Sequence, residues 1–273
     1  CQLDGRPRTI APNLDALEVD VHQELREGWG RIRSFIVQNL RKLTDFSQIE
    51  AEELAVWPGM DELFSLLRLK ALHREGRYDV VIMDCAPTGS TVRMLSMPDV
   101  MRWYMTRLFH VERRMMKWLR PVLSRAIDPV LPDDEVFDAV ENLYNRMDGV
   151  KELLCDPATT TVRLVVNPEK MVIRETQRAH AYLCLFGFSV DAVVVNRILP
   201  ADAEGAFLDA WRRSQAQYVE EIERAFAPVP LLRVRQRSGE VVGLDALAAL
   251  AEEIYGHDDP ARGRPAEPPI SIS

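Results

Sequence analysis

An aspartate ends an apolar run in the sequence VVIMDCAPTGST, which spans residues 80–91. The carboxylate of Asp84 could hold a Mg²⁺-bound water, and Thr88 and Gly89 could present hydroxyl and backbone N–H groups to a phosphate. Pro87 would stiffen this loop, while Gly89 would let the backbone approach an anion with no Cβ in the way. The pattern is short, and a strand end capped by an ordinary turn explains it equally well.

The sequence around this loop predicts alternating strands and helices. We expect strands at residues 13–20, 78–84, 162–167, 190–196 and 229–234. Apolar residues at helical 3–4 spacing indicate helices at residues 22–43 and 61–76. Three further segments between or after the strands have the composition of helices: 169–186, 203–225 and 244–255. The nearly continuous apolar run at 78–84 is typical of a parallel strand covered on both faces. The repeated strand–helix units predict an α/β fold with a doubly wound, mostly parallel sheet.

The segment 92–150 has no strong strand candidate and predicts a helical lobe inserted into this fold. A methionine-rich set of its residues follows 3–4 spacing and could share one helix face: Met94, Met97, Met101, Met105 and Leu108. Flexible methionine faces suit the promiscuous binding of apolar helices, which would make this lobe a client-binding surface. A core stripe inside a small helical bundle is the alternative interpretation.

The residues that follow Asp84 extend into a longer signature. The stretch DCAPTGSTVRMLSMPD (84–99) resembles D-T-A-P-T-G-H-T-L-R-x-L-x-x-P of the ArsA-type ATPases, a family of deviant P-loop proteins. That family includes arsenical-pump ATPases and the ATPases that target tail-anchored proteins in the GET pathway. Five further stretches resemble the family in the same order: NLDALEVD (13–20), WPGMDELFSL (57–66), NPEKMVIRETQR (167–178), VVVNRILP (193–200) and VPLLRVRQRSGEVVGLDAL (229–247). The resemblance covers about residues 12–257 and is strongest toward bacterial members.

The resemblance implies roles for the residues of the Asp84 loop. Asp84 would act on Mg²⁺ through water, and Pro87, Thr88 and Gly89 would form a switch that senses the γ-phosphate of ATP. Ser90 stands where the family frequently has histidine, so communication through this switch is expected to differ in detail.

The resemblance also implies residues for the nucleotide base. Asn196 would hydrogen-bond the adenine edge, and Pro230 and Leu231 would line the base pocket. Without the family pattern, Asn196 is an ordinary turn residue at a strand end. Pro230 and Leu231 would then be the start of a core strand.

The glycine-rich phosphate loop of such ATPases does not occur in these residues. No glycine in the chain is followed by lysine, so the G-K-[ST] core of a P-loop cannot be placed. The resemblance puts that loop before Cys1, and we expect the natural protein to carry it there. Because the loop supplies most of the electrostatic stabilisation of phosphoryl transfer, we expect this chain alone to be catalytically incomplete.

The chain is expected to form one ATPase domain over residues 1–256, followed by a Pro-rich tail or linker over 257–273. Its net charge of −8 and pI of about 5.3 argue against a partner bound through a nucleic-acid backbone. The most apolar window, at 181–190, is too short for an integral membrane segment.

Four scattered cysteines and no CxxC favour a reduced, cytoplasmic compartment. None of Cys85, Cys155 and Cys184 falls where the arsenite-pump members have their cysteine ligands. The sequence therefore gives arsenite binding poor support.

The function that these residues favour is an ATPase that uses ATP and Mg²⁺. As in the family it resembles, it would act as a homodimer and couple hydrolysis to the handling of a cargo, either a hydrophobic client helix or an anion. A nucleotide-free holdase that uses the methionine-rich lobe is one alternative. A partitioning ATPase of the MinD/ParA type is another, although the A-P-T-G-x-T signature and the helical insertion speak against it.

Overall fold

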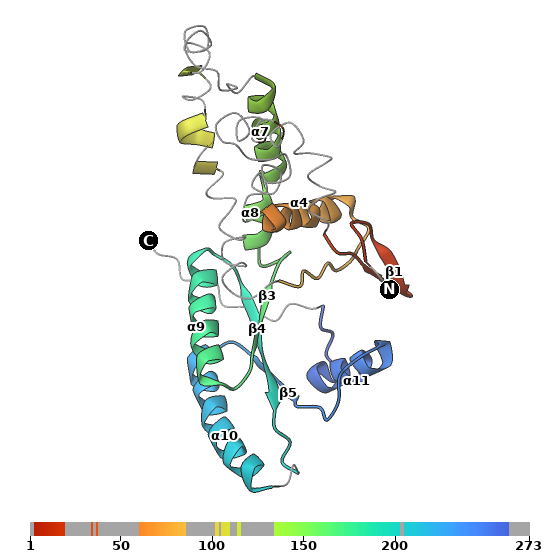
Figure 1. Cartoon of the computed structure of the whole chain (residues 1–273), viewed down its shortest axis with the longest axis vertical. Coiled ribbons are helices and arrows are strands. Elements are labelled where there is room, and N and C mark those ends of the chain that lie inside the picture. The colour runs from red at the N-terminus through yellow and green to blue at the C-terminus, as the bar shows by residue number, and fades with distance from the viewer. Residues whose placement is uncertain are drawn as a thin grey trace. The chain divides into compact units, whose positions relative to one another are not determined.

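The computed structural model describes residues 3–19, 34, 37, 60–85, 102–103, 105–109, 114–115, 134–202 and 205–261. The chain divides into two compact units (Figure 1). Unit 1 comprises Cys1–Lys151 and unit 2 comprises Glu152–Ser273. Among the described residues, no helix has the length and apolar character needed to cross a bilayer.

Unit 2 is built on a parallel three-stranded sheet in the order β3-β4-β5. β3 spans Val162–Val166, β4 spans Val190–Ile198 and β5 spans Leu231–Arg235. The first six residues of the central strand β4 are all buried. This explains their nearly continuous apolar sequence, because a strand covered on both faces exposes neither side of its pleat.

Helices cover both faces of this sheet (Figure 1). α9 (Lys170–Leu185) and α10 (Ala206–Phe226) pack on one face, and α11 (Leu244–Tyr255) packs on the other. The first interface buries one side of the sheet in a cluster of Val166, Ile173, Val193, Val195, Ile222 and Phe226. The second buries Ala192, Val194, Leu232 and Val234, with Leu250, Ile254 and Tyr255 packed against them.

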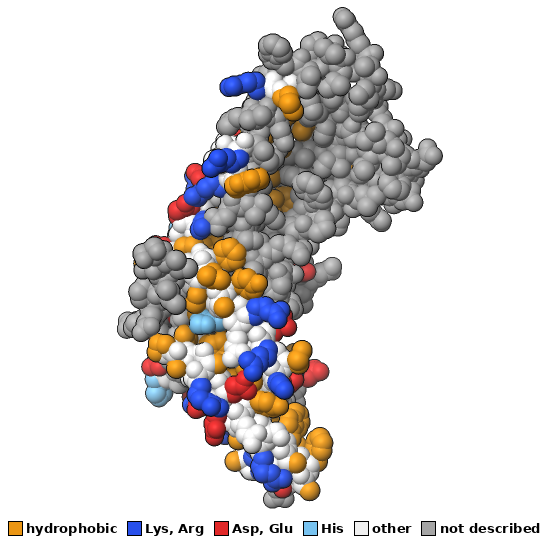
Figure 2. All heavy atoms as spheres, turned by 90° about the vertical axis from the view of Figure 1, so that its left-hand side faces the viewer, with side chains coloured by type: hydrophobic (Ala, Val, Ile, Leu, Met, Phe, Trp, Pro, Cys, Tyr) orange, Lys and Arg blue, Asp and Glu red, His pale blue; other side chains and the backbone are white. Residues whose placement is uncertain are grey.

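The α/β prediction is confirmed in unit 2. Each strand and helix expected between residues 162 and 255 is present, within a few residues of its predicted ends. The outer surface of α9 and α10 mixes acidic, basic and apolar side chains (Figure 2). The exposed apolar residues on these two helices are Met171, Tyr182, Leu185, Phe207 and Trp211.

Unit 1 begins with an antiparallel hairpin of β1 (Arg8–Ala11) and β2 (Leu14–Ala16). Asn13 occupies the turn with a φ of 60°, a left-handed conformation that asparagine tolerates better than most residues. The strand expected over 13–20 is therefore confirmed only in part. Leu14 is 44% exposed, because the hairpin has only two strands and buries little of either face.

Unit 1 also contains several helical segments among its described residues. α4 spans Met60–Glu75 and ends at Gly76, whose φ of +61° fits a helix C-terminus. The segment predicted as an inserted lobe has a π-helical turn at Met105–Phe109 and the helix α7 at Asp134–Met147. α8, at Val150–Cys155, begins at the end of unit 1 and continues into unit 2. Of the helix expected at 22–43, only residues 34 and 37 are described, and both are helical.

α4 is joined to the end of α7 by a lysine. Lys70 Nζ donates to the backbone oxygen of Arg146 at 2.7 Å and also to that of Asp148. A cation at this place is favourable because the last carbonyl groups of a helix carry partial negative charge and lack intrahelical partners. The apolar side of α4 is buried through Leu63, Phe64, Leu66, Leu67 and Leu72.

The strand predicted at 78–84 is wrong in this structure. The segment has no strand conformation, and Ile82 is 87% exposed. Val80 and Val81 are exposed as well. A parallel strand needs hydrogen-bonding neighbours, and none of the strands among the described residues pairs with this segment.

Candidate functional site

The carboxyl ends of β3, β4 and β5 lie at one edge of the unit 2 sheet, which is where parallel α/β sheets bind ligands. Asn196 is half-buried near the end of the central strand β4. Its Oδ1 accepts a hydrogen bond from the backbone N–H of Arg197 at 2.9 Å. Arg197 lies within β4 and has a φ of +58°, at an irregularity in the pairing of β4 with β5 between Val195 and Ile198. This bend of the backbone, called here the turn after Asn196, orients the Asn196 amide.

The turn after Asn196 is fastened to α10 by Gln215. Gln215 Oε1 accepts from the backbone N–H of Leu199 at 2.7 Å, and its Nε2 donates to the backbone oxygen of Arg197 at 3.0 Å. The backbone N–H of Gln236 donates to the oxygen of Ile198 at 2.7 Å. The chain after β5 and the helix α10 therefore hold the turn from two sides.

The end of β5 is fastened to α11 by Glu253. One carboxylate oxygen, Oε1, accepts from the backbone N–H of Arg235 at 3.0 Å and from its side-chain Nε at 3.2 Å. The other, Oε2, forms an ion pair with Arg237. The backbone hydrogen bond from Arg235, followed by the two arginine side chains, lowers the pKa of Glu253.

Pro230 and Leu231 lie at the opposite end of β5 from this turn. The oxygen of Pro230 accepts from the backbone N–H of Val193 at 2.9 Å, and Leu231 pairs with the same residue. Val193 precedes Asn196 by three residues, which is about 10 Å along a strand. Leu231 also packs against the core cluster under α9 and α10. The structure therefore does not bring the predicted base-lining pair beside Asn196.

Asp84 lies in unit 1 at the end of the exposed 78–84 segment, and its own side chain is exposed. Within the described residues, no hydrogen bond or ion pair engages its carboxylate. Pro87, Thr88 and Gly89 lie outside the described residues.

The start of this segment is anchored to the N-terminal hairpin by Asp15. Asp15 Oδ1 accepts from Thr9 Oγ1 at 2.6 Å, and Oδ2 accepts from the Tyr78 hydroxyl at 2.7 Å. Arg77 Nη2 lies 3.0 Å from Oδ2. The hydrogen bonds from Thr9 and Tyr78, with the charge of Arg77, lower the pKa of Asp15, and the bond to Asp15 raises the pKa of Tyr78. The four residues fix where the run toward Asp84 begins.

Comparison with known proteins decides the family. The model of the family described as anion-transporting ATPase matches residues 1–256. A protein of Aquifex aeolicus (strain VF5) named arsenical pump-driving ATPase 1 is 45% identical over 260 residues, which cover 94% of this chain and 65% of that protein. The chain belongs to the anion-transporting ATPase family.

Other relatives carry related names. An arsenical pump-driving ATPase of Chlorobaculum tepidum is 37% identical over 99% of this chain and 67% of its own length. A protein of Entamoeba dispar named ATPase ASNA1 homolog is 26% identical over 91% of this chain and 76% of its own length. The chain thus spans about two thirds of the length of its bacterial relatives.

The anion-transporting ATPases are P-loop NTPases, which use Mg²⁺ with the nucleotide. Mg²⁺ in such sites is held by one or two carboxylates, often through water, together with the phosphates. The exposed carboxylate of Asp84 suits this requirement. Among the described residues there is no cluster of three or more His, Cys, Asp or Glu that would hold a metal by protein ligands alone.

Two of the described cysteines lie beside polar groups of unit 2. Cys184 Sγ lies 3.7 Å from His180 Nε2 on α9, and burial raises the pKa of the thiol and lowers that of the imidazole. Cys155 Sγ instead donates to the backbone oxygen of Phe186 at 3.4 Å.

Of the methionines predicted to share one helix face, the structure describes only Met105. Met105 is only 4% exposed and packs with Phe109 and Phe137. The two phenylalanine rings meet edge to face, with centroids 5.7 Å apart. Met105 is therefore a core residue of the lobe in this structure. Met94, Met97 and Met101 and the side chain of Leu108 lie outside the described residues.

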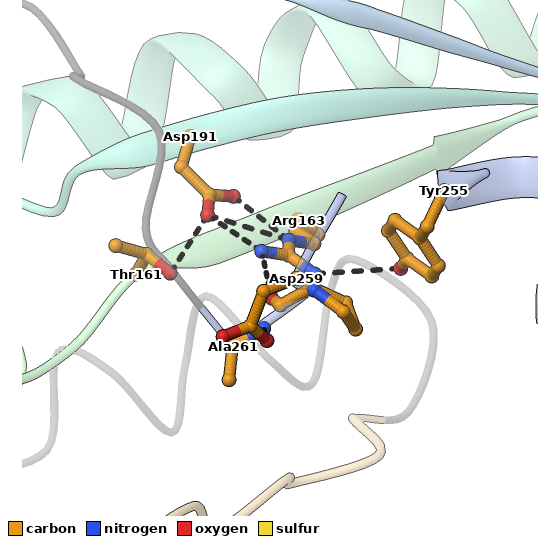
Figure 3. A network of polar contacts seen from close by, with 7 residues as sticks. Thr161, Arg163, Asp191, Tyr255, Asp259 and Ala261 are labelled. Atoms are coloured by element: carbon orange, nitrogen blue, oxygen red, sulfur yellow. Dashed lines mark hydrogen bonds and ion pairs between the residues drawn. The ribbon is translucent and has the colours of Figure 1, made fainter. Parts of the chain in front are cut away.

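A second polar cluster, shown in Figure 3, lies at the amino ends of β3 and β4, whereas Asn196 lies near the carboxyl end of β4. Asp191 is fully buried, accepts from Thr161 Oγ1 at 3.1 Å and pairs with Arg163 Nη2 at 3.0 Å. Arg163 also donates to the Tyr255 hydroxyl at 3.4 Å and to the oxygen of Pro260 at 2.7 Å. The cluster joins β3, β4, α11 and the first residues of the Pro-rich stretch, which indicates a structural role.

Sequence reasoning missed Gln215 and Glu253. Gln215 shares a helix face with the buried Ile222 and Phe226, seven and eleven residues later. A polar residue on an apolar stripe is a visible signal in the sequence, because a buried amide needs hydrogen-bond partners. Glu253 carries no such signal, since it follows another glutamate on a helix with many small residues.

Proposed function

We propose that the natural protein containing these residues binds Mg²⁺ and ATP and hydrolyses the ATP, with Asn196 recognising the adenine base. One observation carries this proposal. Asn196 lies at the carboxyl end of the central strand, with its amide oriented by the turn at Arg197. The carbonyl oxygen accepts one hydrogen bond from the backbone and has capacity for a second, and the NH₂ group offers two donors.

An asparagine amide discriminates between bases by its hydrogen-bonding pattern. Adenine presents an NH₂ donor beside a ring nitrogen acceptor, which matches the oxygen and NH₂ group of Asn196. Guanine presents a carbonyl oxygen at the corresponding position and would face the asparagine oxygen. We therefore propose that this residue gives the site its preference for ATP. In this proposal Pro230 and Leu231 support the base site through the pairing of β5 with β4.

The phosphate side of the proposal rests on Asp84. Its carboxylate would hold Mg²⁺ through a water molecule, and Pro87, Thr88 and Gly89 would contact the γ-phosphate. The bound Mg²⁺ would neutralise charge on the phosphate oxygens. The exposed position of the Asp84 carboxylate supports this role.

We further propose that the protein works as a homodimer in the cytoplasm and couples ATP hydrolysis to the handling of a hydrophobic client helix or an anion. The family match supports the ATPase over the partitioning alternative. A nucleotide-free holdase remains a second candidate for the methionine-rich lobe. The burial of Met105 against Phe109 and Phe137 argues against it, because that side chain faces the core of the lobe.

Titration calorimetry on the natural protein with Mg²⁺ and ATP tests the proposal. We expect Asn196→Ala to weaken ATP binding about tenfold, because a lost bidentate base contact costs about 1–3 kcal/mol. Asn145→Ala is the control, since Asn145 is an exposed asparagine on α7 and lies outside the proposed site. It should leave the affinity unchanged. Absence of ATP binding by the unaltered protein, or equal binding by both variants, would overturn the proposal.

A further inference from the structure

Gln215 is a buried polar residue whose hydrogen bonds go to the backbone of another element. Its side chain is only 5% exposed, and it lies on α10 among residues that pack against the sheet. A buried amide is costly unless it is hydrogen-bonded. Here the oxygen and the nitrogen of the amide each have a backbone partner, one on either side of the turn that follows Asn196.

The backbone that Gln215 holds is the irregular end of β4, where one residue has an uncommon conformation. Arg197 has a φ of +58°, although it is not a glycine. Such conformations persist only where surrounding contacts hold them. Gln215 bonds the oxygen of Arg197 and the N–H of Leu199, and it therefore fixes the peptide groups on both sides of Ile198.

The backbone at Arg197 also sets the orientation of the Asn196 side-chain amide. The Asn196 oxygen is bound to the N–H of Arg197, so the direction of that N–H determines how the side-chain amide lies. The chain of contacts runs from α10 through Gln215 to the Arg197 peptide and on to the Asn196 amide. The hydrogen bonds measure 2.7 to 3.0 Å, and the C=O and N–H of Arg197 that two of them use are connected through the backbone angles of that residue.

We propose that Gln215 is a positioning residue that orients the Asn196 amide and so sets the preference for adenine over guanine nucleotides. This inference rests on the proposed function of Asn196. Glutamine suits the task because it offers one acceptor and one donor at the end of the same side chain. Glutamate keeps the acceptor for Leu199 but would place a carboxylate oxygen against the oxygen of Arg197.

The test compares ATP and GTP binding to the natural protein by calorimetry. Gln215→Met keeps the length and apolar packing of the side chain but removes both hydrogen bonds. We expect the ratio of ATP to GTP affinity to fall about tenfold, which is the scale of one lost base-specific contact. GTP affinity should stay within about twofold, because it does not depend on a correctly oriented Asn196 amide.

Gln217→Met is the matched control, because Gln217 is exposed two residues along the same helix. It should keep the full preference for ATP. Gln215→Glu is a second variant in case Gln215→Met does not fold, and it should also lose preference because it lacks the donor to Arg197.

The outcomes separate this inference from the proposed function. Equal losses of ATP and GTP affinity in both Gln215 variants would show a merely structural role and overturn the inference. An unchanged ratio in folded variants would overturn it as well. Failure of the unaltered protein to bind ATP would overturn the proposed function itself, and the inference with it.

Discussion

Two apolar runs of seven residues, YDVVIMD at 78–84 and VDAVVVN at 190–196, resemble each other in sequence but not in structure. Each has aspartate at its second position and ends in a polar residue that the family resemblance assigns to nucleotide binding. The second run forms most of β4 and is buried up to Val195. The first has no strand conformation, and its Ile82 is 87% exposed.

The difference teaches that apolar content alone does not make a strand. β4 has β3 and β5 as hydrogen-bonded neighbours and is covered by helices on both faces. None of the described strands pairs with the 78–84 segment, so its backbone gains no ladder of hydrogen bonds. Its ordered start comes instead from side chains, through the contacts of Tyr78 and Arg77 with Asp15.

An aspartate cluster in each unit shows a similar difference between an exposed and a buried environment. Asp15 and Asp191 are each bound by a threonine hydroxyl and an arginine. The side chains of Asp191 and Arg163 are 0% and 26% exposed, whereas those of Asp15 and Arg77 are 12% and 61% exposed. Water screens the exposed pair, so the buried pair should matter more for stability.

The largest effect that we predict is the loss of Asp191. Asp191→Ala should lower the free energy of unfolding of unit 2 by about 3 kcal/mol, because it leaves Arg163 without its buried counter-charge. Asp15→Ala, the matched change in the exposed cluster, should cause a clearly smaller loss. Urea denaturation followed by circular dichroism measures both, and equal losses would break the comparison.

A smaller effect should follow from shortening valines in the two apolar runs. Val195 is fully buried in β4, and Val80 is 51% exposed. Val195→Ala should reduce the free energy of unfolding by about 2 kcal/mol, since burial of a valine contributes about that much. Val80→Ala should change it by less than about 0.5 kcal/mol. A loss of similar size in both variants would mean that the 78–84 run is buried after all.

The smallest effect that we predict is a dependence on pH through Glu253. Its pKa in the folded protein lies below the ordinary value of 4.5, so the carboxylate stabilises the fold fully above pH 4.5. As the pH falls below 4.5 the unfolded chain takes up a proton first, and this contribution is lost by the time the pH reaches the folded-state pKa.

Melting temperatures measured between pH 7 and pH 3 test this dependence. The unaltered protein should lose more stability below pH 4.5 than Glu253→Gln does. Glu252→Gln, on the exposed neighbouring residue, should behave like the unaltered protein. Parallel pH profiles for all three proteins would contradict the role of Glu253 at the end of β5.

The sequence predicts unit 2 well because its signals are local. The helix expected at 244–255 is found at those residues, and the strand expected at 190–196 is only two residues longer. The position of Asn196 near a strand end follows from the same pattern. Local signals also predicted a strand at 78–84, but whether an apolar segment forms a strand depends on pairing with other strands, which local signals do not report.

The contacts that orient the site were harder to predict. Gln215 reaches backbone groups 16 and 18 residues earlier in the chain, and Glu253 reaches one 18 residues earlier. Such contacts depend on how helices pack against the sheet, which no short window of sequence contains. The hairpin strand β1 was missed because RTIA is short and three of its four residues are exposed.

The most direct test of the contrast between the two runs is hydrogen–deuterium exchange of the chain of residues 1–273, read by mass spectrometry. Peptides from 190–198 should exchange slowly, at rates set by unfolding of unit 2, because their amides lie in a buried, paired strand. Peptides from 79–84 should exchange within the shortest labelling time. Strong protection of both segments would contradict the account, since it would show that the run ending in Asp84 is a paired strand.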